Sequence, residues 1–324
     1  MFKRIRHVAR AGFLAAGVAL AAFAAPAAAQ TFGVATMQPG TLNYTSGSAI
    51  AKVMQQTLNL QTRVQPSAGE RTLLPLVNGG EADFGIANIA EVVEAYEGKD
   101  RPSKQDKLRV LAAIHPLRVA FFVRKDSDIK TLADLKGKRV PLGFSAMGTI
   151  DAIVRGKLAA ACVTDKDVKP VMVPNVVRSA DDFLSGSADA FEFAIGAGKV
   201  SEVDASVGGI RAVPILDTPE ALAAMRKHYP YVYVTTIAPR PGLVGIPEPT
   251  KIFSYDNLLV VGAHVKDDIA YKVLDTLFKN KPELVATAPW LVELNQATAY
   301  KSYAVPYHPA AVKWFADNKV EIAK

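Results

Sequence analysis

The sequence predicts an α/β fold with two lobes, in which each lobe is a mixed sheet flanked by helices and two strands form a hinge. Short apolar segments alternate with amphipathic helical segments along the chain, which is typical of α/β proteins. The same order of strand, small-residue loop and helix also occurs twice, from Gly40 to Gly80 and again from Gly148 to Gly186. Each half ends with a Gly-x-Ala-Asp segment that leads into a strand. Two lobes of similar topology are the simplest interpretation.

The first lobe is predicted to begin with alternating strands and helices. Its strands are expected at 32–36, 62–65 and 83–87. The helix between the first two carries apolar residues at i, i+3, i+4 and i+8, which is the spacing of one helix face: Ile50, Val53, Met54 and Leu58. The next helix is expected around 73–77. Two β-rich segments, 108–114 and 118–125, then carry the chain out of this lobe.

The second lobe is predicted to contain strands at 139–143, 169–173 and 190–193, with helices around 150–158 and 183–184. Its last helix begins at Pro219 with Thr218 as the N-cap. A strand at 229–236 is expected to return to the first lobe, followed by a strand at 257–262 and helices at 267–280, 282–287 and 309–318. The expected domains are therefore a signal peptide at 1–29, a first lobe at 30–123 plus 236–324, and a second lobe at 124–235.

The N-terminus has the pattern of a secretory signal. Four basic residues precede a short apolar segment at 13–23, and Ala27-Ala28-Ala29 forms an A-x-A cleavage site. We expect cleavage before Gln30 and export to the periplasm; an uncleaved membrane anchor is the alternative. Four of the 38 basic residues and none of the 31 acidic residues lie within 1–29, so the remaining chain carries +3. This charge does not indicate a nucleic-acid partner.

The residue types needed for catalysis do not occur in catalytic patterns. Cys162 is the only cysteine, which excludes an internal disulfide, and no two histidines have the spacing of a zinc site. The segment 143–147 resembles a nucleophile elbow around Ser145, but Met147 stands where the second glycine is needed. We therefore expect no enzyme activity and no cofactor. An exported serine hydrolase that uses Ser145 remains one alternative.

Three loops of small residues, at 39–41, 67–70 and 145–149, each lie between a strand and a helix. Helix N-termini present unpaired N–H groups and a partial positive charge, so several of them facing one cleft would bind an anionic group. This arrangement predicts a solute that carries a carboxylate. The alternative is that the loops are ordinary connections with helix caps.

Several motifs together resemble one family of transport proteins. They are Pro39-Gly40-Thr41 with Tyr44, Pro66-Ser67-Ala68-Gly69, Gly80-Glu81-Ala82-Asp83, Ala95-Tyr96-Glu97-Gly98, Asp134-Leu135-Lys136-Gly137-Lys138, Gly148-Thr149 and His308-Pro309. The chain resembles a TAXI-type solute-binding protein of a TRAP (tripartite ATP-independent periplasmic) transporter.

This resemblance implies a type II periplasmic binding protein fold, a monomer, closure about the hinge and delivery of the solute to membrane permease subunits, with the small and large subunits fused. The chain departs from the family pattern at Phe144–Met147, Ile150, Glu70 and Asn88. These departures place common amino acids and simple organic acids in doubt as ligands. A ligand-binding sensor without transport is a further alternative.

The candidate ligand-binding residues gather around the expected cleft. They are Met37, Thr41, Tyr44, Ser67, Glu70, Asn88, Phe144, Ser145, Met147, Gly148, Thr149, Asn175, Glu192 and Tyr231. Within this set, Glu70 is expected to pair with Arg71 on the surface. Glu192 lies between two phenylalanines of a strand, so its side chain is expected to point the opposite way from theirs, exposed to the cleft or paired in it.

Overall fold

The computed structural model describes residues 30–99 and 103–323, so the expected signal peptide lies outside the described residues. Most of the strands form one eight-stranded sheet with the order β2-β1-β3-β10-β4-β7, to which β8 and β9 add at β4 and β10. A separate parallel pair, β5-β6, completes the second lobe. The strands are β1 Thr31–Thr36, β2 Gln61–Pro66, β3 Phe84–Asn88, β4 Leu108–Arg124, β5 Arg139–Leu142, β6 Lys169–Met172, β7 Phe191–Ala194, β8 Ile210–Ala212, β9 Tyr233–Ile237 and β10 Thr250–Gly262.

Helices cover both parts of the sheet. They are α1 Leu42–Leu58, α2 Glu70–Gly79, α3 Ile89–Glu97, α4 Gly148–Ala160, α5 Val176–Leu184, α6 Gly198–Val207, α7 Pro219–His228, α8 Asp267–Lys279, α9 Lys281–Thr287, α10 Gln296–Ala299 and α11 Pro309–Asp317. Short 3₁₀ helices lie at Leu132–Leu135, Asp165–Asp167 and Pro289–Glu293. Among the helices of the described residues, none combines the length and apolar character needed to cross a bilayer.

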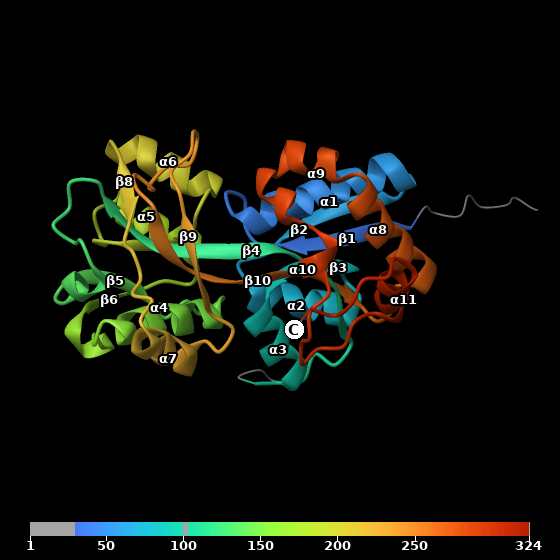
Figure 1. Ribbon diagram of the computed structural model, residues 1–324, viewed down its shortest axis with the longest axis horizontal. Coiled ribbons are helices and arrows are strands. Elements are labelled where there is room, and N and C mark those ends of the chain that lie inside the picture. The colour runs from blue at the N-terminus through green and yellow to red at the C-terminus, as the bar shows by residue number, and fades with distance from the viewer. Residues whose placement is uncertain (1–29, 100–102, 324) are drawn as a thin grey trace, which may run out of the picture. The chain divides into compact units, whose positions relative to one another are not determined.

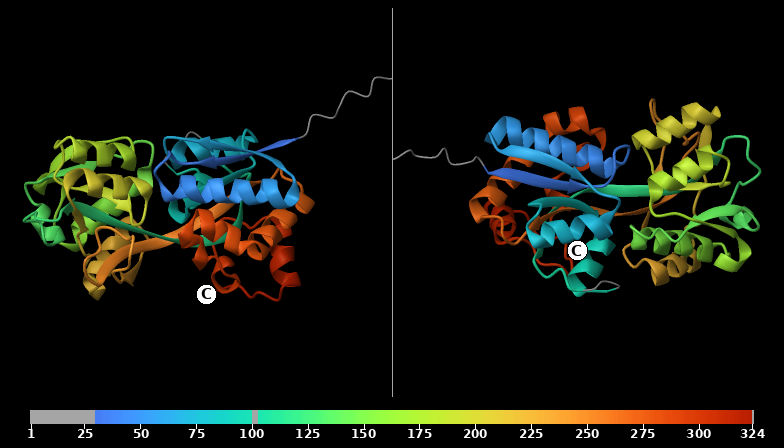
Figure 2. Two further views of the ribbon diagram at one scale, coloured as in Figure 1. Left: turned by 90° about the horizontal axis from the view of Figure 1, so that it is seen from above. Right: turned by 180° about the vertical axis from the view of Figure 1, so that it is seen from behind.

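Two groups of elements are visible in Figure 1. We call β1–β3, α1–α3 and α8–α11 the first lobe, and β5–β9 with α4–α7 the second lobe. β4 and β10 run from one group to the other, and Figure 2 shows the same two connections from two further directions. The α/β fold class with two lobes and a two-strand hinge is therefore confirmed. The residue boundaries of the lobes remain a prediction, because Thr31–Lys324 forms one compact unit by its contacts.

The hinge consists of β4 and β10, which pair antiparallel from Phe253↔Val119 to Gly262↔Leu108. The two β-rich segments expected at 108–114 and 118–125 are parts of the single strand β4, which continues through Pro116. The return crossing is β10, whereas the sequence placed it at 229–236. That segment contains β9, which pairs with the first half of β10 and stays with the second lobe.

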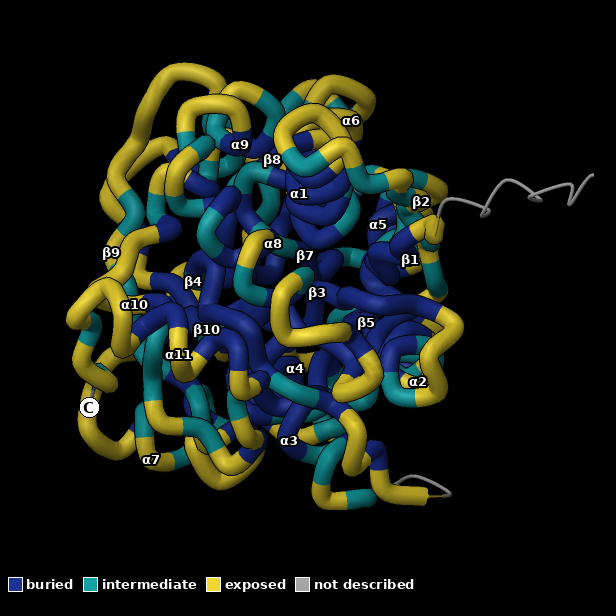
Figure 3. The backbone as a smooth tube through the Cα atoms, turned by 90° about the vertical axis from the view of Figure 1, so that its right-hand side faces the viewer, coloured by how far each residue is buried: buried dark blue, intermediate teal, exposed yellow. Residues whose placement is uncertain are grey.

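The buried core is continuous through the hinge. Figure 3 shows β3, β4 and β10 buried along most of their length. One cluster of buried apolar side chains extends from Leu73 in the first lobe through Phe121 and Phe253 in the hinge to Leu158 in the second lobe. A second cluster around Phe84, Leu259 and Trp314 lies within the first lobe.

Local sequence explains most of the helix starts. Thr218 caps α7 by accepting a hydrogen bond from the Ala221 N–H, as predicted. The helices α3, α6 and α10 were not predicted. α3 follows β3 without a loop, because the Asn88 side chain accepts from the Glu91 N–H and caps the helix at the last residue of the strand.

The buried hinge leads to a stability prediction. Leu259 is completely buried on β10, so Leu259→Ala should lower the free energy of unfolding by about 2–5 kcal/mol through lost burial and a cavity. Urea denaturation measures this change. Val312→Ala, at an exposed position of α11, is the control and should change stability by less than about 0.5 kcal/mol. Equal effects of the two substitutions would contradict the assignment of β10 to the core.

Candidate functional site

A small pocket lies where the two lobes meet the hinge. Its volume is about 30 Å³, and we call it the interlobe pocket. Its lining residues come from both lobes and from both hinge strands: Met37, Thr41, Leu42, Asn43, Glu70, Leu117, Val119, Met147, Ile150, Val176, Glu192, Phe193, Ala194 and Tyr255. A pocket of this volume holds about one water molecule. A larger solute therefore requires the lobes or the lining side chains to move apart.

The N-terminus of α1 forms one wall of the pocket. The Thr41 hydroxyl accepts from the Tyr44 N–H and donates to the Gln38 carbonyl. Asn43 is fixed by the hinge, because the Asn257 amide donates to its Oδ1 at 3.0 Å. The cap of α1 is therefore satisfied by the protein itself.

Glu70 is the first residue of α2, and its side chain is buried with 1% exposure. Its Oε1 accepts from the Asn88 amide at 3.2 Å, and its Oε2 has no hydrogen-bond partner. Burial, and then the nearby Glu91 carboxylate, raise the pKa of Glu70 to about 7. The surface pair with Arg71 that the sequence suggested is wrong, because Glu70 turns inward to Asn88.

Glu192 is on β7 in the second lobe and is paired. The Lys157 ammonium donates to its Oε1 at 2.6 Å and to the Val119 carbonyl at 2.9 Å. Lys157 also lies over the rings of Phe121 and Phe253, about 5.5 and 5.4 Å from their centroids. Burial raises the pKa of Glu192 and lowers the pKa of Lys157, and the ion pair opposes both shifts. The Oε2 of Glu192 has no hydrogen-bond partner.

Hydrogen bonds join the lobes beside the pocket. The Asn88 amide of the first lobe donates to the Thr149 hydroxyl of the second at 3.1 Å, and the Thr149 N–H donates to Glu91 at 3.0 Å. The Tyr229 hydroxyl donates to Asn88 at 3.2 Å. The Arg71 N–H of the first lobe also donates to the Ala146 carbonyl of the second. We call this region of contact between the lobes the junction. One N–H in the first turn of α4, like one in the first turn of α1, therefore donates to a protein side chain.

Five of the residues predicted from the sequence line the pocket: Met37, Thr41, Glu70, Met147 and Glu192. Asn88 and Thr149 lie just behind it, in the hydrogen bonds between the lobes. The other seven are not among its lining residues. Phe144 is completely buried in the core, and Ser145 is exposed. Asn175 caps α5. The remaining four are Tyr44, Ser67, Gly148 and Tyr231.

Two residues of this region were not predicted from the sequence: Tyr255, which lines the pocket, and Lys157, which binds Glu192. Tyr255 follows the predicted return of the chain and could not be placed without the hinge pairing. Lys157 follows Ile150, Ile153 and Val154 on the apolar face of α4, where a lysine requires a buried partner. That position and the glutamate between two phenylalanines on β7 together could have predicted the ion pair.

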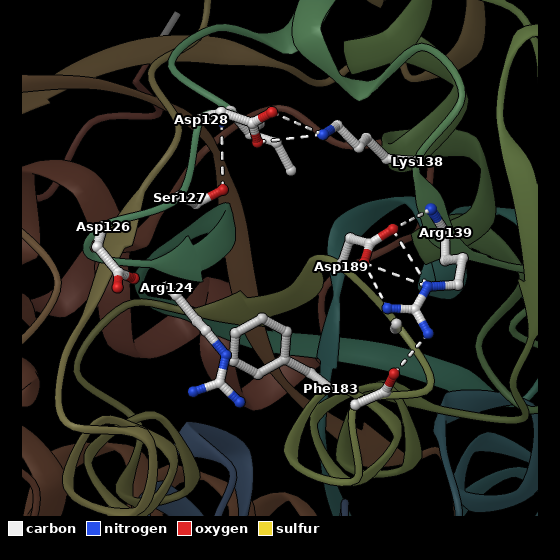
Figure 4. A pocket seen from close by; sticks show the side chains of 11 residues that line it. Arg124, Asp126, Ser127, Asp128, Lys138, Arg139, Phe183 and Asp189 are labelled. Carbon is white, nitrogen blue, oxygen red and sulfur yellow. Dashed lines mark hydrogen bonds and ion pairs between the residues drawn. The ribbon is translucent and has the colours of Figure 1, made fainter.

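A larger groove of about 220 Å³ lies in the second lobe (Figure 4). Its charged groups largely satisfy one another. Lys138 pairs with Asp128 at 2.9 Å, and Arg139 binds both Asp189 and the Gly186 carbonyl. The Arg124 guanidinium lies 5.7 Å from the centre of the Phe183 ring. None of the first-lobe elements contributes a residue to its lining, whereas Arg124 comes from the hinge strand β4.

The serine-hydrolase alternative requires a base beside Ser145. In the described part of the chain, no hydrogen bond joins Ser145 to a histidine. His115 contacts Asn257, His264 contacts Asp83 and His308 contacts the Val265 carbonyl. His228 is exposed at the end of α7. The described residues likewise contain no cluster of His, Cys, Asp and Glu that could hold a metal ion.

The fold and pocket define a two-lobe binding-protein architecture. Similar solved structures include a periplasmic transporter protein (13% identity, 89% of this chain and 92% of that chain, TM-score 0.57). Another is PhnD1 from Prochlorococcus marinus in complex with methylphosphonate (12% identity, 90% of this chain and 99% of that chain, TM-score 0.55). A third is the alkanesulfonate-binding protein SsuA from Xanthomonas axonopodis pv. citri (14% identity, 91% of this chain and 94% of that chain, TM-score 0.50). At these identities the similarity shows the fold.

The family is shown by the sequence itself. Residues 34–318 match the model of the NMT1-like family, and the chain belongs to that family. The match does not distinguish the TAXI type suggested by the motifs, which therefore remains part of the proposal below.

Glu70 should make stability depend on pH. Its folded pKa of about 7 lies above the ordinary value of 4.5, so the folded protein binds more protons than the unfolded chain between these values. Its contribution is fully present below about pH 4.5 and is lost as the pH rises through 7. As the pH rises from 5 to 8, the free energy of unfolding of Glu70→Gln should therefore increase by about 2–3 kcal/mol relative to that of wild type. Urea denaturation at the two pH values measures this change. Glu81→Gln, at an exposed position, is the control and should show the same dependence of stability on pH as wild type. If Glu70→Gln also showed the wild-type dependence, this would contradict the burial of Glu70.

The buried ion pair leads to a second prediction. Lys157→Met leaves the Glu192 carboxylate buried without a counterion and should lower the unfolding free energy by about 3–5 kcal/mol. The double variant Lys157→Met/Glu192→Gln removes both charges and should recover most of that loss. Thermal or urea unfolding of wild type, Lys157→Met, Glu192→Gln and the double variant measures the coupling energy between the two side chains. Additive losses would show that the two side chains do not stabilise one another.

Proposed function

We propose that this protein is an exported solute-binding protein that captures a small organic solute between its lobes and delivers it to a membrane transporter without catalysis. The observation that supports this function is the interlobe pocket, whose walls come from both lobes and from β4 and β10. A solute in such a pocket contacts both lobes only when they are closed, so binding favours closure. The fold shared with periplasmic binding proteins supports the same role.

The transporter partner proposed from the sequence is a TRAP permease with fused small and large subunits. The motifs that resemble TAXI-type proteins support it. A gene for such a permease next to the gene for this protein would support the partner, whereas a neighbouring transport ATPase gene would contradict it. The sensor alternative predicts neither gene.

The carboxylate expected on the solute is not favoured by the contacts. The N–H groups of Tyr44 and Thr149, in the first turns of α1 and α4, already donate hydrogen bonds to the side chains of Thr41 and Glu91. Glu70 in the pocket wall would also repel an anion when it is ionised, whereas Lys157 neutralises Glu192.

The role itself is tested by solute release. Protein purified from periplasmic extract should begin at Gln30, and mass spectrometry after denaturation should identify a small solute bound in about equimolar amount. The same solute should be recovered unchanged after prolonged incubation with the protein. Turnover of the solute would contradict a pure binding role.

Closure can be blocked at Gly69. Its backbone is extended, so alanine is tolerated there, but a Cβ would overlap the Ala146 carbonyl and the Met147 side chain across the junction. Gly69→Ala should leave each lobe folded, prevent full closure and weaken solute binding about 5- to 150-fold, the equivalent of 1–3 kcal/mol of overpacking. Small-angle scattering with the released solute should show contraction of the wild type and less contraction of the variant. Gly79→Ala is the control, because Gly79 is at the other end of α2 and a Cβ there would meet only the Glu81 side chain at 3.8 Å; this variant should contract normally. Normal contraction of Gly69→Ala would contradict the closure geometry.

A further inference from the structure

Two glutamates that line the interlobe pocket each have one buried carboxylate oxygen without a hydrogen-bond donor. These oxygens are Oε2 of Glu70, from the first lobe, and Oε2 of Glu192, from the second. Each side chain has only 1% exposure. An unsatisfied buried carboxylate oxygen is costly, so two of them lining one pocket indicate a ligand that supplies donors.

The charges around the pocket favour a single positive charge on that ligand. The Lys157 ammonium neutralises Glu192 and is directed to Glu192 Oε1 and the Val119 carbonyl. When Glu70 is ionised, these three groups together carry one net negative charge. No arginine or lysine is among the residues that line the pocket.

The other residues that line the pocket indicate the chemical character of the rest of the ligand. Most of the lining side chains are apolar, including Leu42, Leu117, Val119, Ile150 and Val176. The pocket volume of about 30 Å³ accommodates a group as large as one water molecule, which is also the size of an ammonium group. The attached hydrocarbon part would contact the apolar wall as the lobes adjust around it.

We propose, on the basis of the function proposed above, that the pocket selects a solute with a primary amine on an apolar body, whose ammonium group donates to Glu70 and Glu192 together. One ligand group then connects the first lobe to the second. The three donors of an ammonium group are sufficient for both carboxylates.

Binding at this site is coupled to a proton. Glu70 faces Glu91 of α3, Asn88 of β3, Tyr255 of β10 and Tyr229 at the end of α7, and its neighbour Arg71 lies against Gly148. The pKa of about 7 keeps much of Glu70 protonated below neutral pH. An ammonium group stabilises the ionised form, so binding releases a proton and the affinity rises between pH 6 and pH 8.

The test uses ligands matched in size. Isothermal titration calorimetry at pH 8 compares the n-alkylamines from propylamine to hexylamine with the carboxylic acids of the same chain lengths. The amines should bind and the acids should not. Titration of the best amine in two buffers of different ionisation enthalpy at pH 6.5 should reveal proton release. Binding of the acids in preference to the amines, or of neither series, would overturn the proposal.

Variants then assign the contacts. Glu70→Gln should weaken amine binding about 10- to 150-fold, since a hydrogen bond to a charged group contributes about 1.5–3 kcal/mol, and should abolish proton release. Glu192→Gln/Lys157→Met keeps the buried charge balanced and should also weaken binding. Glu202→Gln, at an exposed position of α6, should bind as wild type does. Unchanged affinity in Glu70→Gln would overturn this proposal, and the general binding role would survive if the released solute still closes the lobes.

Discussion

The antiparallel pairing of β4 with β10 is the constraint on which the rest of the structure depends. These strands are the covalent connections between the lobes, and they pair over ten positions. Their side chains also form the floor of the interlobe pocket, with Leu117 and Val119 from one strand and Tyr255 from the other. A change in the twist of this pair would therefore move the lobes and alter the pocket together. This coupling gives a small solute a means of changing the arrangement of much larger elements.

The buried charges depend on the same strands. Lys157 donates to the Val119 carbonyl of β4 and lies over Phe253 of β10, so the second-lobe helix α4 is anchored to the hinge as well as to Glu192. Replacing a buried ion pair by apolar residues is often neutral or stabilising, so stability alone does not explain its presence. Its position in the pocket wall supports a role in binding. Glu70 lines the same pocket from the first lobe.

Periodicity predicted the elements well, because strands and helices of this fold bury one face each. It could not show that the segments on either side of Pro116 form one strand, since a proline usually interrupts a central strand and only the long partner β10 reveals the continuity. Loop residues were harder to place for a related reason. Phe144 and Ser145 are neighbours in the sequence, yet one is in the core and the other in solvent, and the backbone of Phe144 at φ 25° turns the chain there. A pattern of residue types does not specify such a turn.

The hydrogen bonds between the lobes set the energetic scale for closure. The Asn88–Thr149 bond joins the lobes through uncharged groups, and such bonds contribute about 0.5–1.5 kcal/mol each, while a bond to a carboxylate such as that from the Thr149 N–H to Glu91 contributes about 1.5–3 kcal/mol. Contacts of this size hold the closed arrangement without making it irreversible. A solute shifts the equilibrium only by the difference between its affinities for the closed and open forms. A ligand group that requires one carboxylate from each lobe has that difference built into its geometry, because Glu70 and Glu192 line a single pocket only when the lobes are together. Weak protein contacts and a stronger bridging contact from the solute thus give a protein that closes on its ligand and can still release it.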